Sequence, residues 1–195
     1  MATLTRLALL VVGLASLLGI ASATAGAVTW HNSGSTAFTA TAGSRTLSST
    51  GAALNCASAT ATGTAPALTS GATYAVSGTA TLAGCSLAGV ATLTECSYTF
   101  TATSQSASVT SGTVDLTCGW YQFNSKLCHT GGTVSATYTN PSSGVGVLAL
   151  ATGGSIVTSN GTSGTCPLGN GDRAHLSAMT FRTTSANPPV ITRTA

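Results

Sequence analysis

The stretch from residue 95 to residue 120 constrains the fold of this chain more than any other part of it. It reads E-C-S-Y-T-F-T-A-T-S-Q-S-A-S-V-T-S-G-T-V-D-L-T-C-G-W. When this stretch is folded back about Ala107, Cys96 comes to lie opposite Cys118. Apolar and polar residues then alternate along both strands, with the period of two that marks a sheet with one buried face. The pattern predicts a β-hairpin, its register and a disulfide.

The six cysteines extend this argument to the rest of the chain. An even number in an exported chain indicates disulfides, and no C-x-x-C spacing points to a metal site. We expect the pairs Cys56–Cys85, Cys96–Cys118 and Cys128–Cys166. The first two follow from hairpin registers and the third is what remains, although the Cys56–Cys85 register needs a bulge to bury its cysteines. A rival set stays open, with Cys85 joined to Cys96, Cys118 to Cys128 and Cys56 to Cys166.

The first 25 residues have the features of a signal peptide. Arg6 supplies the positive charge, residues 7–20 form an apolar run, and A-x-A sites follow at 21–23 and 23–25. The run is shorter than the ~20 residues of a membrane-spanning helix. We therefore expect residues 1–25 to be a signal peptide and residues 26–195 to be one disulfide-bonded β domain. The expected mature protein is secreted and has no transmembrane span after processing.

Beyond the leader, the chain alternates short β-type stretches with turns. The expected strands are at 27–30, 36–41, 45–50, 53–64, 73–85, 133–139, 145–158, 174–184 and 190–194. The stretch at 145–158 supplies one strand, or two that are split at Gly153 and Gly154. The strands at 36–41 and 45–50 flank Ala42, Gly43 and Ser44, which predicts a hairpin between them. No stretch after the leader has sustained helical periodicity. The predicted fold class is all-β: a single antiparallel β-sandwich or flattened barrel, held together by disulfides.

Four stretches carry a resemblance to known proteins. They are T-A-F-T-A-T-A-G-S-R-T-L-S-S-T-G-A-A-L-N-C at 36–56, T-A-T-L-A-G-C at 79–85, C-P-L-G-N-G-D at 166–172 and N-P-P-V-I-T-R-T at 187–194. Here the chain resembles uncharacterised exported Ala/Thr/Ser/Gly-rich proteins of high-GC Gram-positive bacteria, a group that brings no established activity. More distantly, its first half resembles exported alkane-oxidation activator proteins, which are associated with biofilm matrix and hydrophobic substrates.

The ionisable residues do not predict a catalytic, cofactor or metal site. Charged residues are 5% of the chain, which gives no basic patch for nucleic acid. Glu95 and Asp115 share a face of the hairpin, but Asp115 lies opposite Thr99, so the two acids are roughly 13 Å apart along the strand. A glycosidase pair lies closer, at about 5–9.5 Å. The histidines, His31, His129 and His175, lack ligand spacing.

Two other groups of residues suggest functions. Rows of hydroxyl side chains are expected on one sheet face: Ser58, Thr60, Thr62 and Thr64, and then Thr99, Thr101 and Thr103. Such faces suit glycans or another ordered surface, although Thr also suits any solvated strand. Four aromatic residues, Trp120, Tyr121, Phe123 and Tyr138, are the expected lining of a pocket, if a pocket exists.

The leading hypothesis is therefore a non-catalytic protein of the cell surface or extracellular matrix. Its hydroxyl-rich β faces would meet cell-wall or matrix glycan, or other copies of the chain. The alternative is an extracellular carrier of a small apolar ligand, and the third is an enzyme such as a glycan hydrolase. An internal cavity of ~300 Å³ or more would favour the carrier.

Overall fold

A computed structural model describes residues 27–49, 52–123, 125–161 and 166–195. Within these residues the chain forms only β-strands, turns and irregular segments. No helix in the described part is long and apolar enough to cross a membrane. The expected signal peptide at 1–25 lies outside the described residues.

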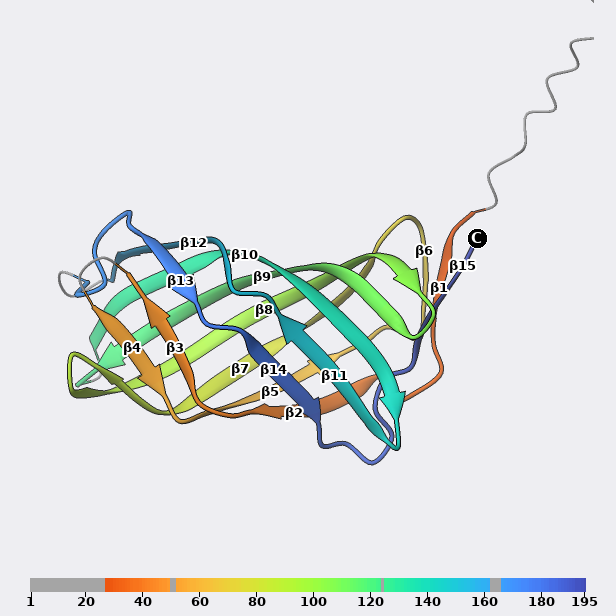
Figure 1. Ribbon diagram of the computed structural model, residues 1–195, viewed down its shortest axis with the longest axis horizontal. Coiled ribbons are helices and arrows are strands. Elements are labelled where there is room, and N and C mark those ends of the chain that lie inside the picture. The colour runs from red at the N-terminus through yellow and green to blue at the C-terminus, as the bar shows by residue number, and fades with distance from the viewer. Residues whose placement is uncertain (1–26, 50–51, 124, 162–165) are drawn as a thin grey trace, which may run out of the picture.

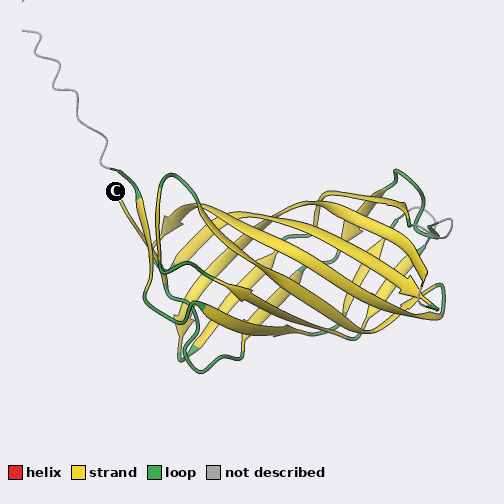
Figure 2. Cartoon of the chain, turned by 180° about the vertical axis from the view of Figure 1, so that it is seen from behind, coloured by secondary structure: helices red, strands yellow, loops and turns green. Residues whose placement is uncertain are grey.

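Four long strands form one continuous wall. They are β7 (Tyr74–Leu87), β8 (Val90–Ser106), β9 (Val109–Gln122) and β10 (Ser125–Ser142). Each pairs antiparallel with the next along most of its length. The alternation of apolar and hydroxyl residues explains this, because every second side chain can be buried while the others face solvent. Figure 2 shows these long, tilted strands from behind.

The other wall is built from four strands that are each interrupted near the middle. The interrupted strands are β2 (Ala37–Ala42) with β3 (Arg45–Ser48), β4 (Ala53–Cys56) with β5 (Ser58–Thr64), β11 (Val145–Leu150) with β12 (Gly153–Asn160), and β13 (Arg173–Leu176) with β14 (Met179–Thr183). One or two residues separate the two parts of each strand. We call this the broken wall. In Figure 1, β11, β13 and β14 cross in front of the continuous wall.

The two walls close into a barrel. Both parts of the β11/β12 strand pair with β10, and both parts of the β4/β5 strand pair with β7. The remaining pairings run β11–β14–β2–β5 at one level and β12–β13–β3–β4 at the other. Four continuous and four interrupted strands thus make eight positions around the barrel, and every position is next to its sequence neighbour. The prediction of an all-β antiparallel fold held by disulfides is confirmed, and closure makes it a flattened barrel.

A small sheet lies against one end of the barrel. Its strands are β1 (Thr29–Asn32), β6 (Leu68–Ser70) and β15 (Ile191–Thr194), with β1 in the middle. Trp30 from β1 is fully buried and stacks on Tyr74, with ring centroids 5.9 Å apart. Figure 1 shows this cap at the end where both ends of the described chain lie.

All three predicted disulfides are present: Cys56–Cys85, Cys96–Cys118 and Cys128–Cys166. Cys96 lies opposite Cys118, as the hairpin register requires. The bulge needed to bury Cys56 and Cys85 is also present. The β7–β8 register shifts between Leu82 and Cys85, where Gly84 has a φ of 61°.

One predicted hairpin is wrong. The segments at 36–41 and 45–50 do not pair with each other, because β2 and β3 are successive parts of one strand. Instead β2 pairs with β5 and β3 pairs with β4. Ala42, Gly43 and Ser44 resemble a turn, but long-range pairing with the 53–64 segment keeps the chain running in one direction.

Candidate ligand cavity

The barrel contains an apolar cavity of about 120 Å³. Its lining comes from all eight barrel positions and from Pro189 and Ile191 beside the cap. Inward-facing residues of the continuous wall, such as Phe100 and Val114, meet Leu148 and Phe181 of the broken wall around it. The cavity is therefore part of the barrel interior, and its walls are made by the alternating inward residues of every strand.

Small side chains leave this space unfilled. Ala40, Ala61 and Ala80 are buried and lie side by side on adjacent strands, with Ala40 opposite Ala61 and Ala61 opposite Ala80. All three line the cavity. An empty apolar cavity costs about 24 cal/mol per Å³, so one of about 120 Å³ lowers stability by about 3 kcal/mol. Three larger aliphatic residues would remove much of that cost.

Most polar side chains in the lining have hydrogen-bond partners. The indole Nε1 of Trp120 donates to Thr130 Oγ1 at 3.1 Å. The Tyr138 hydroxyl donates to the carbonyl of Pro189 at 2.6 Å, and the Tyr98 hydroxyl donates to the carbonyl of Thr62 at 3.2 Å. The remaining surface presented to the cavity is almost entirely carbon. Its chemistry suits an apolar occupant, because a polar group placed against it would find no partner.

Three tyrosines of the continuous wall are held in their neutral form by this environment. Burial raises the pKa of Tyr74 and that of Tyr98 to about 12. Burial, and secondarily the proximity of Tyr74, also raises the pKa of Tyr138 above its ordinary value. Tyr74 and Tyr138 donate to backbone carbonyls near the cap, of Pro66 and Pro189 respectively. They close the capped end of the barrel as uncharged groups.

Arg45 is the exception among the polar lining residues. It shares the inward face of β3 with Leu47, lines the cavity and is half-buried. Its Nε is buried and has no hydrogen-bond partner. Its Nη1 donates to the carbonyl of Ser44. This residue was not predicted from the sequence, although its spacing of two from Leu47 is the signal that would have placed it inside.

Two of the four aromatic residues predicted to line a pocket do line the cavity, and two do not. Trp120 and Tyr138 are buried and line the cavity. Tyr121 and Phe123 are not part of its lining, which corrects their predicted place. Tyr121 follows an inward residue and so faces outward, where the Lys126 ammonium lies 5.4 Å from its ring centroid. Phe123 lies in the turn after β9 and is 92% exposed.

The predicted hydroxyl residues lie on the outer face of the barrel. Ser58, Thr60, Thr62 and Thr64 are exposed along β5, Thr103 is exposed on β8, and Thr99 and Thr101 are half-buried there. One row crosses five strands in register: Thr39, Thr62, Thr79, Ser97 and Thr117. A shallow groove of about 480 Å³ also crosses this surface. Its hydroxyl lining is Thr103, Ser111, Thr113, Ser135 and Thr137.

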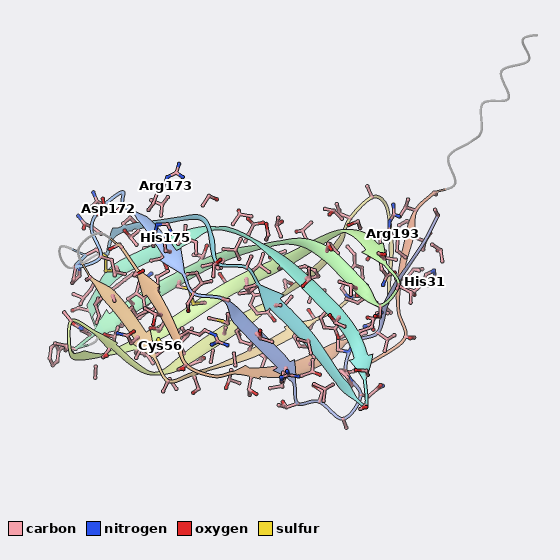
Figure 3. All side chains as sticks on the ribbon, in the orientation of Figure 1. His31, Cys56, Asp172, Arg173, His175 and Arg193 are labelled. Carbon is pink, nitrogen blue, oxygen red and sulfur yellow. A yellow bond between two sulfur atoms is a disulfide. The ribbon has the colours of Figure 1, made fainter. Side chains whose placement is uncertain are left out.

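The acids and histidines do not converge. Asp115 lies opposite Thr99, four residues along from Glu95, and both acids are exposed on the outer face. Figure 3 places Asp172 and His175 near one end of the barrel and His31 at the other. Among the described residues, no three histidine, cysteine or acidic side chains gather as a metal site would require.

No protein-family model, no curated protein and no solved structure matches this chain.

Proposed function

We propose that this protein is an extracellular carrier that holds a small apolar ligand inside its barrel. The observation that carries the proposal is the apolar cavity of about 120 Å³, lined from every strand position. A barrel of eight strands has an interior of the width that either packs with side chains or holds one small ligand. Here the row of alanines leaves room that larger residues would have filled.

The setting outside the cell rests on two supports. Three disulfides indicate an oxidising environment. The signal-peptide features of residues 1–25 support export through the secretory route. Together they favour a protein that meets its ligand in the medium or at the cell surface.

The size of the cavity limits the ligand. Its volume of about 120 Å³ does not reach the ~300 Å³ named above as favouring a carrier, the size at which pockets for drug-sized molecules begin. The proposal is therefore confined to smaller ligands. The volume is close to the ~150 Å³ of an engineered apolar cavity that admits benzene. The proposed ligand is therefore a single ring or a short alkyl chain.

Titration of the oxidised, full-length protein with toluene tests the proposal. We expect saturable one-to-one binding, a change in tryptophan fluorescence because Trp120 lines the cavity, and a higher melting temperature with ligand. Ala80→Leu places a larger side chain in the cavity and should abolish binding. Ala75→Leu is the matched control, because Ala75 lies on the same strand but faces solvent.

Two results would overturn the proposal. One is the absence of saturable binding by the folded wild-type protein. The other is equal loss of binding in Ala80→Leu and Ala75→Leu, which would place the toluene outside the barrel.

A second function is favoured by the outer surface. The registered hydroxyl row and the groove of about 480 Å³ support the hypothesis of a surface or matrix protein that contacts glycan or its own copies. Nearly uncharged hydroxyls meet sugars without the cost of desolvating ions. Pull-down of the protein with cell walls and matrix polysaccharide tests this. Replacing Thr113 and Thr137 together by valine should weaken retention, whereas Ala80→Leu should leave it unchanged.

The third hypothesis, a glycan hydrolase, gains no support from the geometry. Glu95 and Asp115 stand four residues apart along the exposed outer face and do not form a close pair.

A further inference from the structure

The broken wall contains an interruption in its hydrogen-bonded ladder. β2 and β14 are paired at Thr41 and Arg182, and β3 and β13 are paired at Leu47 and Leu176. Ser177 N extends the second ladder by donating to the carbonyl of Thr46. Residues 42–45 lie between these two ladders on one strand, and residues 178–181 lie between them on the neighbouring strand. Neither ladder pairs a residue of the first segment with a residue of the second. We call this interval the window. Figure 1 shows β3 and β14 on its two sides.

The window adjoins the cavity. Arg45 from one side of it and Met179 and Phe181 from the other all line the cavity. Arg45 is half-buried, so its side chain reaches from the apolar interior to solvent. A ligand that entered here would leave its trailing end beside the guanidinium.

The guanidinium at this place is poorly matched to its protein surroundings. An arginine keeps its charge in proteins, and burying a charged group without a partner is unfavourable. The Nε–H is buried against the cavity and has no acceptor, while Nη1 is occupied by the carbonyl of Ser44. Trp120, Tyr138 and Tyr98, which also line the cavity, donate to protein acceptors. Arg45 Nε is therefore an unmatched donor of the cavity lining, and it lies beside the window.

We propose that the cavity binds a short-chain carboxylate, with the alkyl chain inside the barrel and the carboxylate on the Arg45 guanidinium at the window. The inference rests on the proposed carrier function and deepens it. A carboxylate supplies the acceptor that Nε lacks, and the planar edge of a guanidinium binds both oxygens of such a group. An aliphatic chain matches the carbon surface deeper in the cavity.

The experiment compares pentanoate with 1-pentanol, which have the same chain length and different head groups. Both are short enough for a cavity of about 120 Å³. Binding to the oxidised, full-length protein is measured by calorimetric titration. Hydrogen bonds to charged groups contribute about 1.5–3 kcal/mol, so pentanoate should bind about tenfold or more tightly than 1-pentanol. Arg45→Gln should remove this preference and leave the affinity for 1-pentanol unchanged. Arg45→Lys should keep part of it, because the charge remains without the planar fork.

Arg182→Gln is the matched control. Arg182 pairs with Thr41 at the edge of the same window but lies on the outer face and is exposed. Its loss should not change the ratio of the two affinities. Melting curves of all variants identify any variant that does not fold. If Arg45→Gln does not fold, the affinity ratio of Arg45→Lys tests the assignment instead.

The outcomes separate the two proposals. If 1-pentanol binds and pentanoate binds no more tightly, the assignment of Arg45 is overturned while the carrier function stands. If Arg182→Gln and not Arg45→Gln removes the preference, the carboxylate is on the outer surface and the assignment is equally overturned. If neither compound binds to the folded wild-type protein, the carrier function itself fails.

Discussion

The two walls of the barrel use the same residue types in different ways. The continuous wall consists of strands β7 to β10, and their ladders run nearly from end to end. The broken wall covers the same length with pairs of short strands and loses its ladder between residues 42–45 and 178–181. An unbroken ladder satisfies backbone groups and fixes the register, but it leaves no passage between strands. The interruption gives up some of that regularity at one place, beside the cavity.

The two walls also carry different residues. The continuous wall carries the disulfide Cys96–Cys118 and all three tyrosines with raised pKa values, Tyr74, Tyr98 and Tyr138. The broken wall carries Arg45 and the window. We expect changes in the continuous wall to act on global unfolding, and changes in the broken wall to act on local opening and on binding as well.

The largest effects should come from removing the disulfide within the continuous wall, Cys96–Cys118, or the one that joins the broken wall to β7, Cys56–Cys85. Cys96–Cys118 and Cys56–Cys85 close loops with sequence separations of 22 and 29 residues. The chain-entropy model gives about 3.5 kcal/mol for each loop. Cys56 lies where β4 ends and β5 has not begun, so its removal should also loosen the native state. We expect Cys56→Ala with Cys85→Ala to lose more stability than Cys96→Ala with Cys118→Ala, as measured by urea unfolding.

The wild-type protein and a reduced sample are the references for this pair of variants. Equal losses would mean that the break near Cys56 is as rigid as the continuous ladder. A larger loss for the Cys96–Cys118 variant would contradict the comparison of the walls.

A smaller effect should come from adding one methyl group at a glycine of each wall. Gly78 in β7 lies opposite Gly63 and Tyr98, and a Cβ there would overlap the carbonyl oxygen of Thr62 on the next strand. Gly78→Ala should therefore cost about 2–3 kcal/mol. A Cβ at Gly43 would meet open space, so Gly43→Ala should be neutral or stabilise by up to ~1 kcal/mol.

Thermal unfolding of the two alanine variants checks this prediction. Similar melting temperatures for Gly78→Ala and Gly43→Ala would contradict it, because they would show that the strands around Gly78 accommodate the added methyl group as easily as the window does.

The smallest effect should be a loss of stability at alkaline pH, caused by the buried tyrosines of the continuous wall. Burial raises the pKa of Tyr74 and Tyr98 to about 12, so the folded protein keeps protons that the unfolded chain releases near pH 10. Stability should therefore fall as the pH rises from about 10 through 12. Tyr98→Phe should reduce this pH dependence, as followed by urea unfolding at each pH.

Tyr121→Phe, on the outer face of β9, is the control for this measurement. If it reduces the pH dependence as much as Tyr98→Phe does, the alkaline effect does not come from the interior tyrosines.

The sequence allowed the continuous wall to be predicted better than the broken one. The alternation from Cys96 to Cys118 is uninterrupted, so two strands, their register and their disulfide follow from local pattern alone. The interruptions do not follow from local pattern. Ala42, Gly43 and Ser44 resemble a hairpin turn, and only the pairing of β2 with β5 shows that the chain continues in the same direction.

The site was predicted less completely than the fold. Trp120 and Tyr138 line the cavity, whereas Tyr121, which was grouped with them, lies one residue from Trp120 and so on the opposite face. The cavity has no sequence signal of its own, since it depends on three alanines meeting across three strands. Arg45 was missed because a charged residue at a strand end is usually solvated.

The pairing of β1 with β15 has a mechanical consequence. Thr29 lies opposite Thr194 in an antiparallel ladder, so both ends of the described chain leave the molecule side by side. A force that pulled these two ends apart would act on one ladder pair at a time, as in opening a zipper. Shear, in which many hydrogen bonds resist together, would not arise there. The cap would peel away at low force, and only then would tension reach β2 and the barrel.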